Sequence, residues 1–142
     1  MDIVSRFLHI LAAAWAAGSL IYTYYVLSPA VQAMAANERA QLLGRLSSRL
    51  RPLAHTAITL ALITGLYNFY RIYQAGVLPG YHMWFGIKVL LALHVFGMLD
   101  VLSKPPSGDP KRDAKRSRLA LGGLISALII LAIGAYLRTL HV

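Results

Sequence analysis

The chain has 142 residues, enough for one domain, and 58% of them are hydrophobic, with a mean hydropathy of +0.59. This composition excludes an ordinary soluble domain, and the lack of cysteine excludes disulfides and thiolate ligands. The net charge of +9 would suit nucleic acid, but most basic residues lie in two connections between apolar segments. The charge therefore indicates membrane topology, and no nucleic-acid partner is expected.

Four apolar segments are each long enough to span a bilayer, which takes about 20 residues. They are Val4–Leu27, Leu53–Tyr73, His82–Leu102 and Leu119–Leu137. The segments predict an all-α fold, an integral membrane four-helix bundle that forms a single transmembrane domain over residues 1–142. The lipid bilayer is its expected partner, and a homo-oligomer or a larger membrane complex is left open.

The basic residues follow the first and the third span, so an even number of spans separates the two basic connections. Both connections then face the same side, and the positive-inside rule makes that side cytoplasmic. The sequence therefore predicts a protein of the bacterial inner (plasma) membrane with both termini outside. Nothing in the first span indicates a cleaved signal peptide, because its apolar stretch is too long.

The segments between the spans contain prolines and an amphipathic pattern that predict where the helices begin and end. Pro29 is expected to end the first span, because proline removes a helix donor. The segment 30–50 alternates a leucine stripe with a row of arginines, which predicts an amphipathic helix lying in the cytoplasmic interface among lipid phosphates. A cytoplasmic extension of the first span is the alternative. Pro52 should begin the second span, and the proline-rich loop 104–116 should have little structure of its own.

Ionisable side chains inside a span are costly and are functional candidates by default. In chain order they are His9, His55, Lys88, His94 and Asp100. At a rise of about 1.5 Å per residue, His9 and Lys88 lie roughly 9 Å below the outer surface, and His94 lies about 12 Å from the cytoplasmic one. Two histidines at similar height could ligate one haem iron. Spacing alone leaves open whether His94 pairs with His55 or with His9.

Small residues surround the first of these histidines. Ala13 lies on the same helical face as His9, which would leave a flat space for a macrocycle, although plain helix packing predicts small residues too. Met98 lies one turn from His94, and a His/Met pair would also suit copper, unless Met98 only fills space. Lys88 either extends toward the surface or pairs with a haem propionate or another anion.

These residues resemble a known family. The stretch "LHILAAAWAAGSLIYTYYVLSPAV" resembles the first span of the copper-resistance D (CopD) proteins and the related HemJ-type protoporphyrinogen oxidases. "RLSSRLRPLAHTAITLALITGLY" is similar to their arginine-rich entry to a span ending in Thr-Gly, and "WFGIKVLLALH" resembles the HemJ pattern of Trp84, Lys88 and His94. The last span lacks the Asn-Glu-Val-Pro segment of HemJ proteins, and no methionine-rich cluster is present.

The resemblance implies a four-helix membrane unit, with b-type haem in the HemJ branch and copper passage in the CopD branch. His9 and His94 match family positions, whereas His55 rests on its depth alone. The expected function is b-type haem binding that serves electron transfer or a haem-linked redox step, and membrane oxidoreductase activity is left open. The alternatives are a copper-handling protein that uses His9, His94 and Met98, and a non-catalytic subunit whose histidines only join helices.

Overall fold

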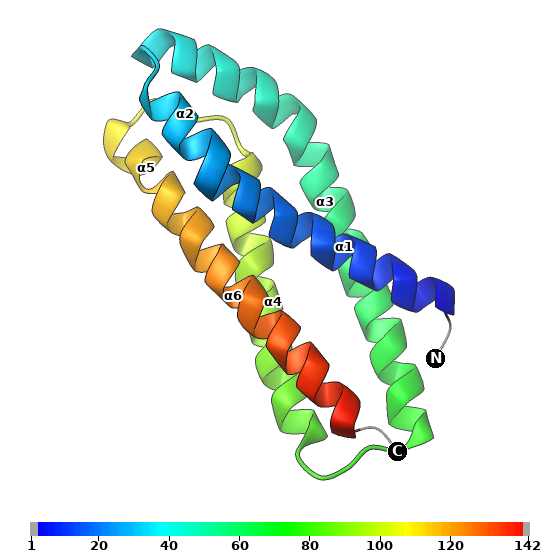
Figure 1. Ribbon diagram of the computed structural model, residues 1–142. Coiled ribbons are helices and arrows are strands. Elements are labelled where there is room, and N and C mark those ends of the chain that lie inside the picture. The colour runs from blue at the N-terminus through cyan, green and yellow to red at the C-terminus, as the bar shows by residue number, and fades with distance from the viewer. Residues whose placement is uncertain (1–2, 141–142) are drawn as a thin grey trace.

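The computed structural model describes residues 3–140, and all its regular elements are helical. The helices are α1 (Ile3–Tyr22), α2 (Ser28–Gln32), α3 (Ala36–Ala75), α4 (Tyr81–Ser103), α5 (Pro110–Ala114) and α6 (Arg116–Leu137), with a π-helical turn at Thr23–Leu27 and a 3₁₀ turn at Arg138–Leu140. The four long helices alternate in direction (Figure 1). The expected all-α four-helix bundle is confirmed.

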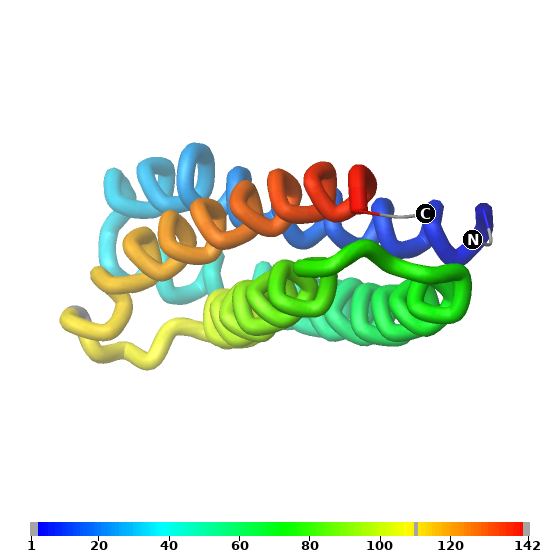
Figure 2. The backbone as a smooth tube through the Cα atoms, turned by 90° about the horizontal axis from the view of Figure 1, so that it is seen from below, coloured from blue at the N-terminus to red at the C-terminus, as the bar shows by residue number. Residues whose placement is uncertain are grey.

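The four long helices form two layers. α1 and α6 lie in one layer, and α3 and α4 lie in the other (Figure 2). Contacts are most numerous across the layers, where α1 packs on α3 and α4 packs on α6. The two basic connections lie at one end of the bundle, and the two ends of the described chain lie at the other (Figure 1). The end that holds the two basic connections is called the basic end below.

The core is thin and comes mainly from three helices. Its main cluster comprises Ala16 and Leu20 of α1, Val95 and Leu99 of α4, and Leu124 and Ala127 of α6. A second cluster at the opposite end is built around Tyr81, Ile133 and Leu137. Most large apolar side chains outside these clusters point away from the bundle, with Leu66, Leu90 and Ile125 each at least half exposed. Such a surface suits lipid rather than water.

Three stretches of the described chain are long and apolar enough to cross a membrane: Ile3–Gln32, Tyr81–Ser103 and Lys111–Leu140. The protein is therefore an integral membrane protein. The expected second span lies in the second half of α3. That half is less apolar than the others because it carries His55, Asn68 and several threonines, and the first half of α3 carries arginines.

The expectation that Pro29 ends the first span is wrong. The chain stays helical from α1 through α2, and Pro29 lies in the first turn of α2, directly after the π-helical turn. A proline ring normally meets the carbonyl four residues earlier. The wider π turn moves those carbonyls, so the helix continues instead of breaking.

The boundary expected at Pro52 is also wrong. Pro52 lies inside α3, a single helix of 40 residues, so the segment 30–50 is not a separate interfacial helix. Its residues are divided between α2 and the first half of α3, which arches across the basic end (Figure 1). Hydroxyls of Ser47 and Ser48 donate to the carbonyls of Gly44 and Arg45 in the turn before the proline. The carbonyl that Pro52 leaves without a helical donor is that of Ser48, so these bonds do not replace the lost one.

The connection between α4 and α6 has more structure than expected. Asp109 caps α5 by accepting a hydrogen bond from the Lys111 backbone N–H at 2.9 Å. Asp113 accepts hydrogen bonds from the backbone N–H and the hydroxyl of Ser107. The short helix therefore forms because two acidic residues bind the loop around it.

Candidate functional site

The three histidines of the spans each join a different pair of helices. His9 of α1 bonds to α3, His55 of α3 bonds to Asp100 of α4, and His94 of α4 bonds to Ser126 of α6. The histidine rings therefore have separate partners, and the structure does not show two of them facing one another. Sequence spacing had left open whether His94 pairs with His55 or with His9. In the structure each of the three rings lies at a different helix interface.

His9 makes the most enclosed of these contacts. Its Nδ1 lies 3.2 Å from the carbonyl oxygen of Ala61 and 3.1 Å from the hydroxyl of Thr64. The carbonyl can only accept, and the Thr64 hydroxyl already donates to the carbonyl of Leu60. The proton of the neutral ring must therefore be on Nδ1. Nε2 then carries a lone pair, makes no hydrogen bond with any of residues 3–140, and is not fully buried.

Gly65 gives the His9 ring its place against α3. A Cβ atom at Gly65 would lie 3.0 Å from Cε1 of His9 and 3.5 Å from its Nδ1. An alanine would already require the ring to shift by a few tenths of an ångström, and a larger side chain would push it away from Ala61 and Thr64. The Thr-Gly pair therefore works as one unit, in which the Thr64 hydroxyl accepts a hydrogen bond from Nδ1–H of the ring and Gly65 leaves room for the ring.

Lys88 is the predicted residue that faces the last helix. It is half-buried on α4, and a Cβ atom at Gly134 of α6 would lie 3.7 Å from its Nζ. Over residues 3–140, Lys88 forms no ion pair or hydrogen bond, because the acidic residues there lie toward the basic end. An unpaired cation in a membrane span is costly and favours an anionic partner.

One polar contact of this region was not expected from the sequence. Ser5 of α1 donates a hydrogen bond to the amide oxygen of Asn68 on α3 at 2.9 Å, and both side chains are buried. Asn68 follows Thr64 by one turn, and Ser5 precedes His9 by one turn. A search for polar residues at helical spacing from His9 and Thr64 would have found them.

The other predicted residues lie elsewhere. His55 is exposed, with its Nε2 3.0 Å from Asp100, and Asp100 also binds Lys104 at 2.6 Å, so this group belongs to the basic end. His94 is exposed too, with its Nδ1 2.9 Å from the Ser126 hydroxyl. Met98 faces α6, where its Cβ would lie 3.3 Å from a Cβ at Gly123. This position makes Met98 a packing residue of the α4–α6 contact.

Ala13 lies one turn from His9 and is half-buried, whereas the fully buried positions of α1 are Ser5, Ala12, Ala16 and Leu20. The face that Ala13 shares with His9 therefore borders the tightest packing and is not part of it. A small residue here leaves space next to the ring. The structure is consistent with either of the uses expected for that space.

The positions of the predicted site residues show whether they could hold a metal ion or a haem. Within residues 3–140, no group of three or more His, Asp or Glu side chains could hold a metal ion together, so a copper site of that type is not built. A haem needs less from the protein, namely one imidazole with a free nitrogen and its other nitrogen fixed. His9 meets that requirement.

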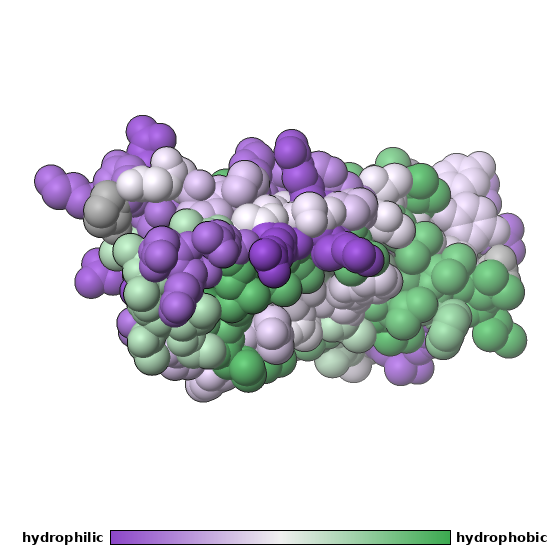
Figure 3. Space-filling model, turned by 90° about the horizontal axis from the view of Figure 1, so that it is seen from above, coloured by the Kyte–Doolittle hydropathy of each residue, from purple (hydrophilic) through white to green (hydrophobic). Residues whose placement is uncertain are grey.

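The surface agrees with a membrane location. Hydrophilic side chains gather at the basic end, and hydrophobic surface extends toward the opposite end (Figure 3). Fold, surface and the polar groups between the helices define a helical integral membrane protein with buried polar contacts. Comparison with family models, with characterised proteins and with solved structures gives no match for this chain.

Proposed function

We propose that the protein binds b-type haem within the membrane and serves electron transfer or a haem-linked redox step, with His9 as an axial ligand. The observation that carries the proposal is the hydrogen bond from His9 Nδ1 to the Ala61 carbonyl. Ligating histidines usually donate their other ring N–H to such an acceptor, which fixes the tautomer and raises the basicity of the ligating nitrogen. Bound haem would supply one-electron redox chemistry.

Lys88 is the proposed partner of a haem propionate. Its ammonium group lacks a carboxylate partner over residues 3–140 and lies against the small residue Gly134. Ala13 leaves space beside the ring on the neighbouring turn. His94 is the candidate for a second ligand, since its Nδ1 is also held by a side chain of the next helix. His55 is the weaker candidate because Asp100 binds its Nε2.

The proposed location is the bacterial inner membrane, with four spans, both termini outside and the basic end in the cytoplasm. Both basic connections lie at one end of the bundle, as this orientation requires (Figure 1). A single cysteine placed at Ser107 should react with a membrane-impermeant thiol reagent in inverted vesicles and not in intact cells. Labelling in intact cells alone would reverse the orientation.

A second function is favoured by a specific observation, because each membrane histidine bonds across a helix interface. The protein would then be a non-catalytic subunit of a larger membrane complex, with its histidines holding the helices together. Such hydrogen bonds contribute about 0.6 kcal/mol on average in membranes. Under this second proposal, replacing a histidine changes stability and leaves no spectroscopic trace.

An absorption spectrum of the purified full-length protein separates the two functions. Haem binding predicts a Soret band and a sharp α-band after reduction. His9→Ala and His94→Ala should each alter the spectrum or the haem content, whereas His82→Ala, an exposed position at the other end of α4, should not. A colourless preparation that contains copper would favour the copper-handling alternative. A colourless and metal-free one would favour the structural subunit.

Two further variants test the roles of the neighbouring residues. Thr64→Val keeps the shape of the side chain but removes an acceptor for His9 Nδ1, so it should shift the spectrum while haem remains bound. Ala13→Leu should lower haem content by filling the space beside the ring. If His55→Ala alone removes haem and His9→Ala has no effect, His9 is not the ligand.

A further inference from the structure

A groove near the basic end is separate from the histidine contacts. Its volume is about 340 Å³, and it is lined by residues of three helices: Trp15, Gly18, Ser19, Tyr22 and Thr23 from the first, Leu50, Leu53 and Ala54 from α3, and Leu99, Leu102 and Ser103 from α4. No histidine lines it. The volume is at the lower end of the range of ligand sites, about 300–1,000 Å³.

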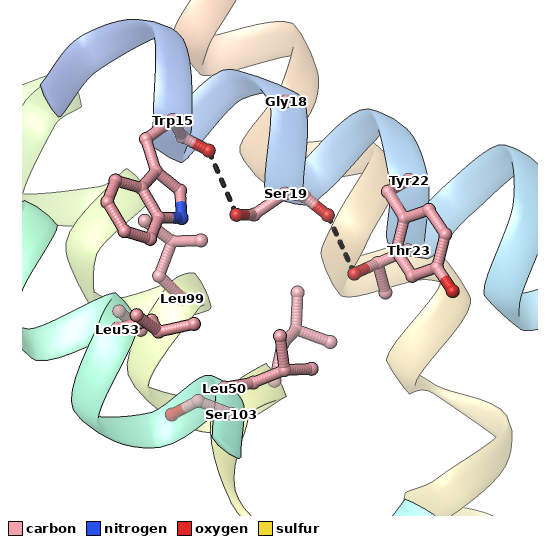
Figure 4. A pocket seen from close by; sticks show the side chains of 11 residues that line it. Trp15, Gly18, Ser19, Tyr22, Thr23, Leu50, Leu53, Leu99 and Ser103 are labelled. Atoms are coloured by element: carbon pink, nitrogen blue, oxygen red, sulfur yellow. Dashed lines mark hydrogen bonds between the residues drawn. The ribbon is translucent and has the colours of Figure 1, made fainter. Parts of the chain in front are cut away.

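The groove offers mainly apolar contacts, because the hydroxyl groups of its serines and threonine are already hydrogen-bonded. The hydroxyls of Ser19, Thr23 and Ser103 each donate to a carbonyl of their own helix, so they offer little to a polar ligand. Trp15 and Tyr22 project from the first helix toward the leucines of α3 and α4 (Figure 4). A sugar, nucleotide or amino acid would find few partners here, whereas a hydrocarbon chain would fit the lining.

Two cations are the chain neighbours of a residue that lines this groove. Arg49 and Arg51 flank the lining residue Leu50, about 100° to either side of it on the helix. Both are exposed, and neither forms a hydrogen bond or ion pair over residues 3–140. Lys104 lies beside Ser103 but is already paired with Asp100. To meet one anion in front of Leu50, both arginines must extend around α3 from opposite sides.

We propose that this groove binds one acyl chain of an anionic phospholipid and that Arg49 and Arg51 hold its phosphate. The apolar lining accounts for the chain, and the unpaired arginines account for the preference for negative charge. The site lies where a bilayer brings both parts of the lipid, with the chain in the hydrocarbon and the headgroup at the surface. It is independent of haem, because none of the proposed haem residues lines it.

Trp15 provides a direct readout of occupancy. The chain has two tryptophans, so a Trp84→Phe background leaves Trp15 as the single fluorophore. The full-length protein would be reconstituted with phospholipids whose acyl chains are brominated, either phosphatidylglycerol or phosphatidylcholine, at equal mole fractions. Brominated phosphatidylglycerol should quench Trp15 at lower mole fraction than brominated phosphatidylcholine. Inorganic phosphate should not reverse the quenching, because the chain contributes to binding.

Matched variants test the two halves of the site. Each basic residue near an anionic surface contributes about fivefold in lipid association, so Arg49→Gln with Arg51→Gln should weaken the phosphatidylglycerol preference by about 25-fold. Lys111→Gln with Arg112→Gln, in the α4–α6 connection, is the control of equal charge. Arg49→Lys with Arg51→Lys should retain most of the preference, which guards against a folding defect.

Gly18→Leu should reduce quenching by both lipids, because a side chain at Gly18 enters the groove and its Cβ would meet nothing within 4 Å. Gly97→Leu, which is equally free of contacts but outside the groove, should leave quenching unchanged. Equal quenching by the two lipids overturns the proposal even if Gly18→Leu reduces both. A preference that survives the loss of both arginines overturns it as well.

Discussion

The two helix pairs that cross the layers are held together in different ways. α3 meets α1 through small or polar groups, since its buried residues are Ser47, Ala57, Ala61, Thr64 and Asn68. α6 meets α4 through a mostly apolar surface, with Leu124, Ile133 and Leu137 among its buried residues. Hydrogen bonds cross the first interface at Ser5 and at His9, and one at His94 crosses the second.

The difference between the two helix pairs decides which of them can hold a functional side chain in a fixed position. In a membrane, apolar packing gives little specificity, because lipid tails are as apolar as leucine. Polar contacts fix the rotation and height of one helix against another, because their geometry is directional. The α1–α3 contact therefore presents a side chain at a defined position, whereas the α4–α6 contact mainly supplies packing. The proposed ligand His9 belongs to the first pair.

The largest expected effect is that of Gly65→Leu in the α1–α3 contact. The new side chain would collide with the His9 ring, whose Cε1 is 3.0 Å from the position of a Cβ. Overpacking of this kind costs about 1–3 kcal/mol, and the ring would also lose its bonds to Ala61 and Thr64. Reversible unfolding in mixed micelles measures the free energy. Gly86→Leu, where a Cβ would meet nothing within 4 Å, is the control and should change little.

The next effect concerns the α4–α6 contact and Gly123. A Cβ there would lie 3.1 Å from Cδ2 of Leu20 and 3.3 Å from Cβ of Met98. Leu20 is fully buried and Met98 Cβ is fixed to the backbone, so Gly123→Ala should cost about 1 kcal/mol. Gly122→Ala has open space and should gain up to about 1 kcal/mol of helix propensity. If neither variant changes the free energy of unfolding in the micelle assay, the α4–α6 interface is less tightly packed than the distances at Gly123 indicate.

The sequence predicted the helices better than their ends. Hydrophobic length predicted the four long helices. The boundaries expected at Pro29 and Pro52 were wrong, because the helix continues through both, at Pro29 directly after a π turn. The polar residues of the spans were identifiable because each is costly in lipid. Their partners were not, since a hydrogen bond across helices depends on rotation and tilt. The contact of His55 with Asp100 was not predicted either, although both lie near the same end of the membrane.

A smaller effect is expected for Ser5→Ala in the α1–α3 contact. The change leaves the buried amide oxygen of Asn68 without the donor that binds it at 2.9 Å. The expected cost is about 0.6 kcal/mol and no more than about 1.7 kcal/mol, the range found for membrane hydrogen bonds. The same micelle assay measures it. Ser48→Ala, which removes an exposed bond within α3, should have almost no effect.

The smallest effect is expected for Ser126→Ala, the counterpart of Ser5→Ala in the α4–α6 contact. Ser126 is buried, but its partner His94 is exposed, so its ring can rotate to another position once the hydroxyl is lost. The Asn68 side chain cannot move in this way, because it is buried between α1 and α3. The cost for Ser126→Ala should therefore be below about 0.6 kcal/mol. An equal cost for the two serine variants would mean that both helix pairs depend on polar contacts to the same degree, and that His94 is held as firmly as His9. The haem spectrum of Ser126→Ala would then separate a second ligand from a structural histidine, because a ligand's spectrum shifts when the group holding its other nitrogen is removed.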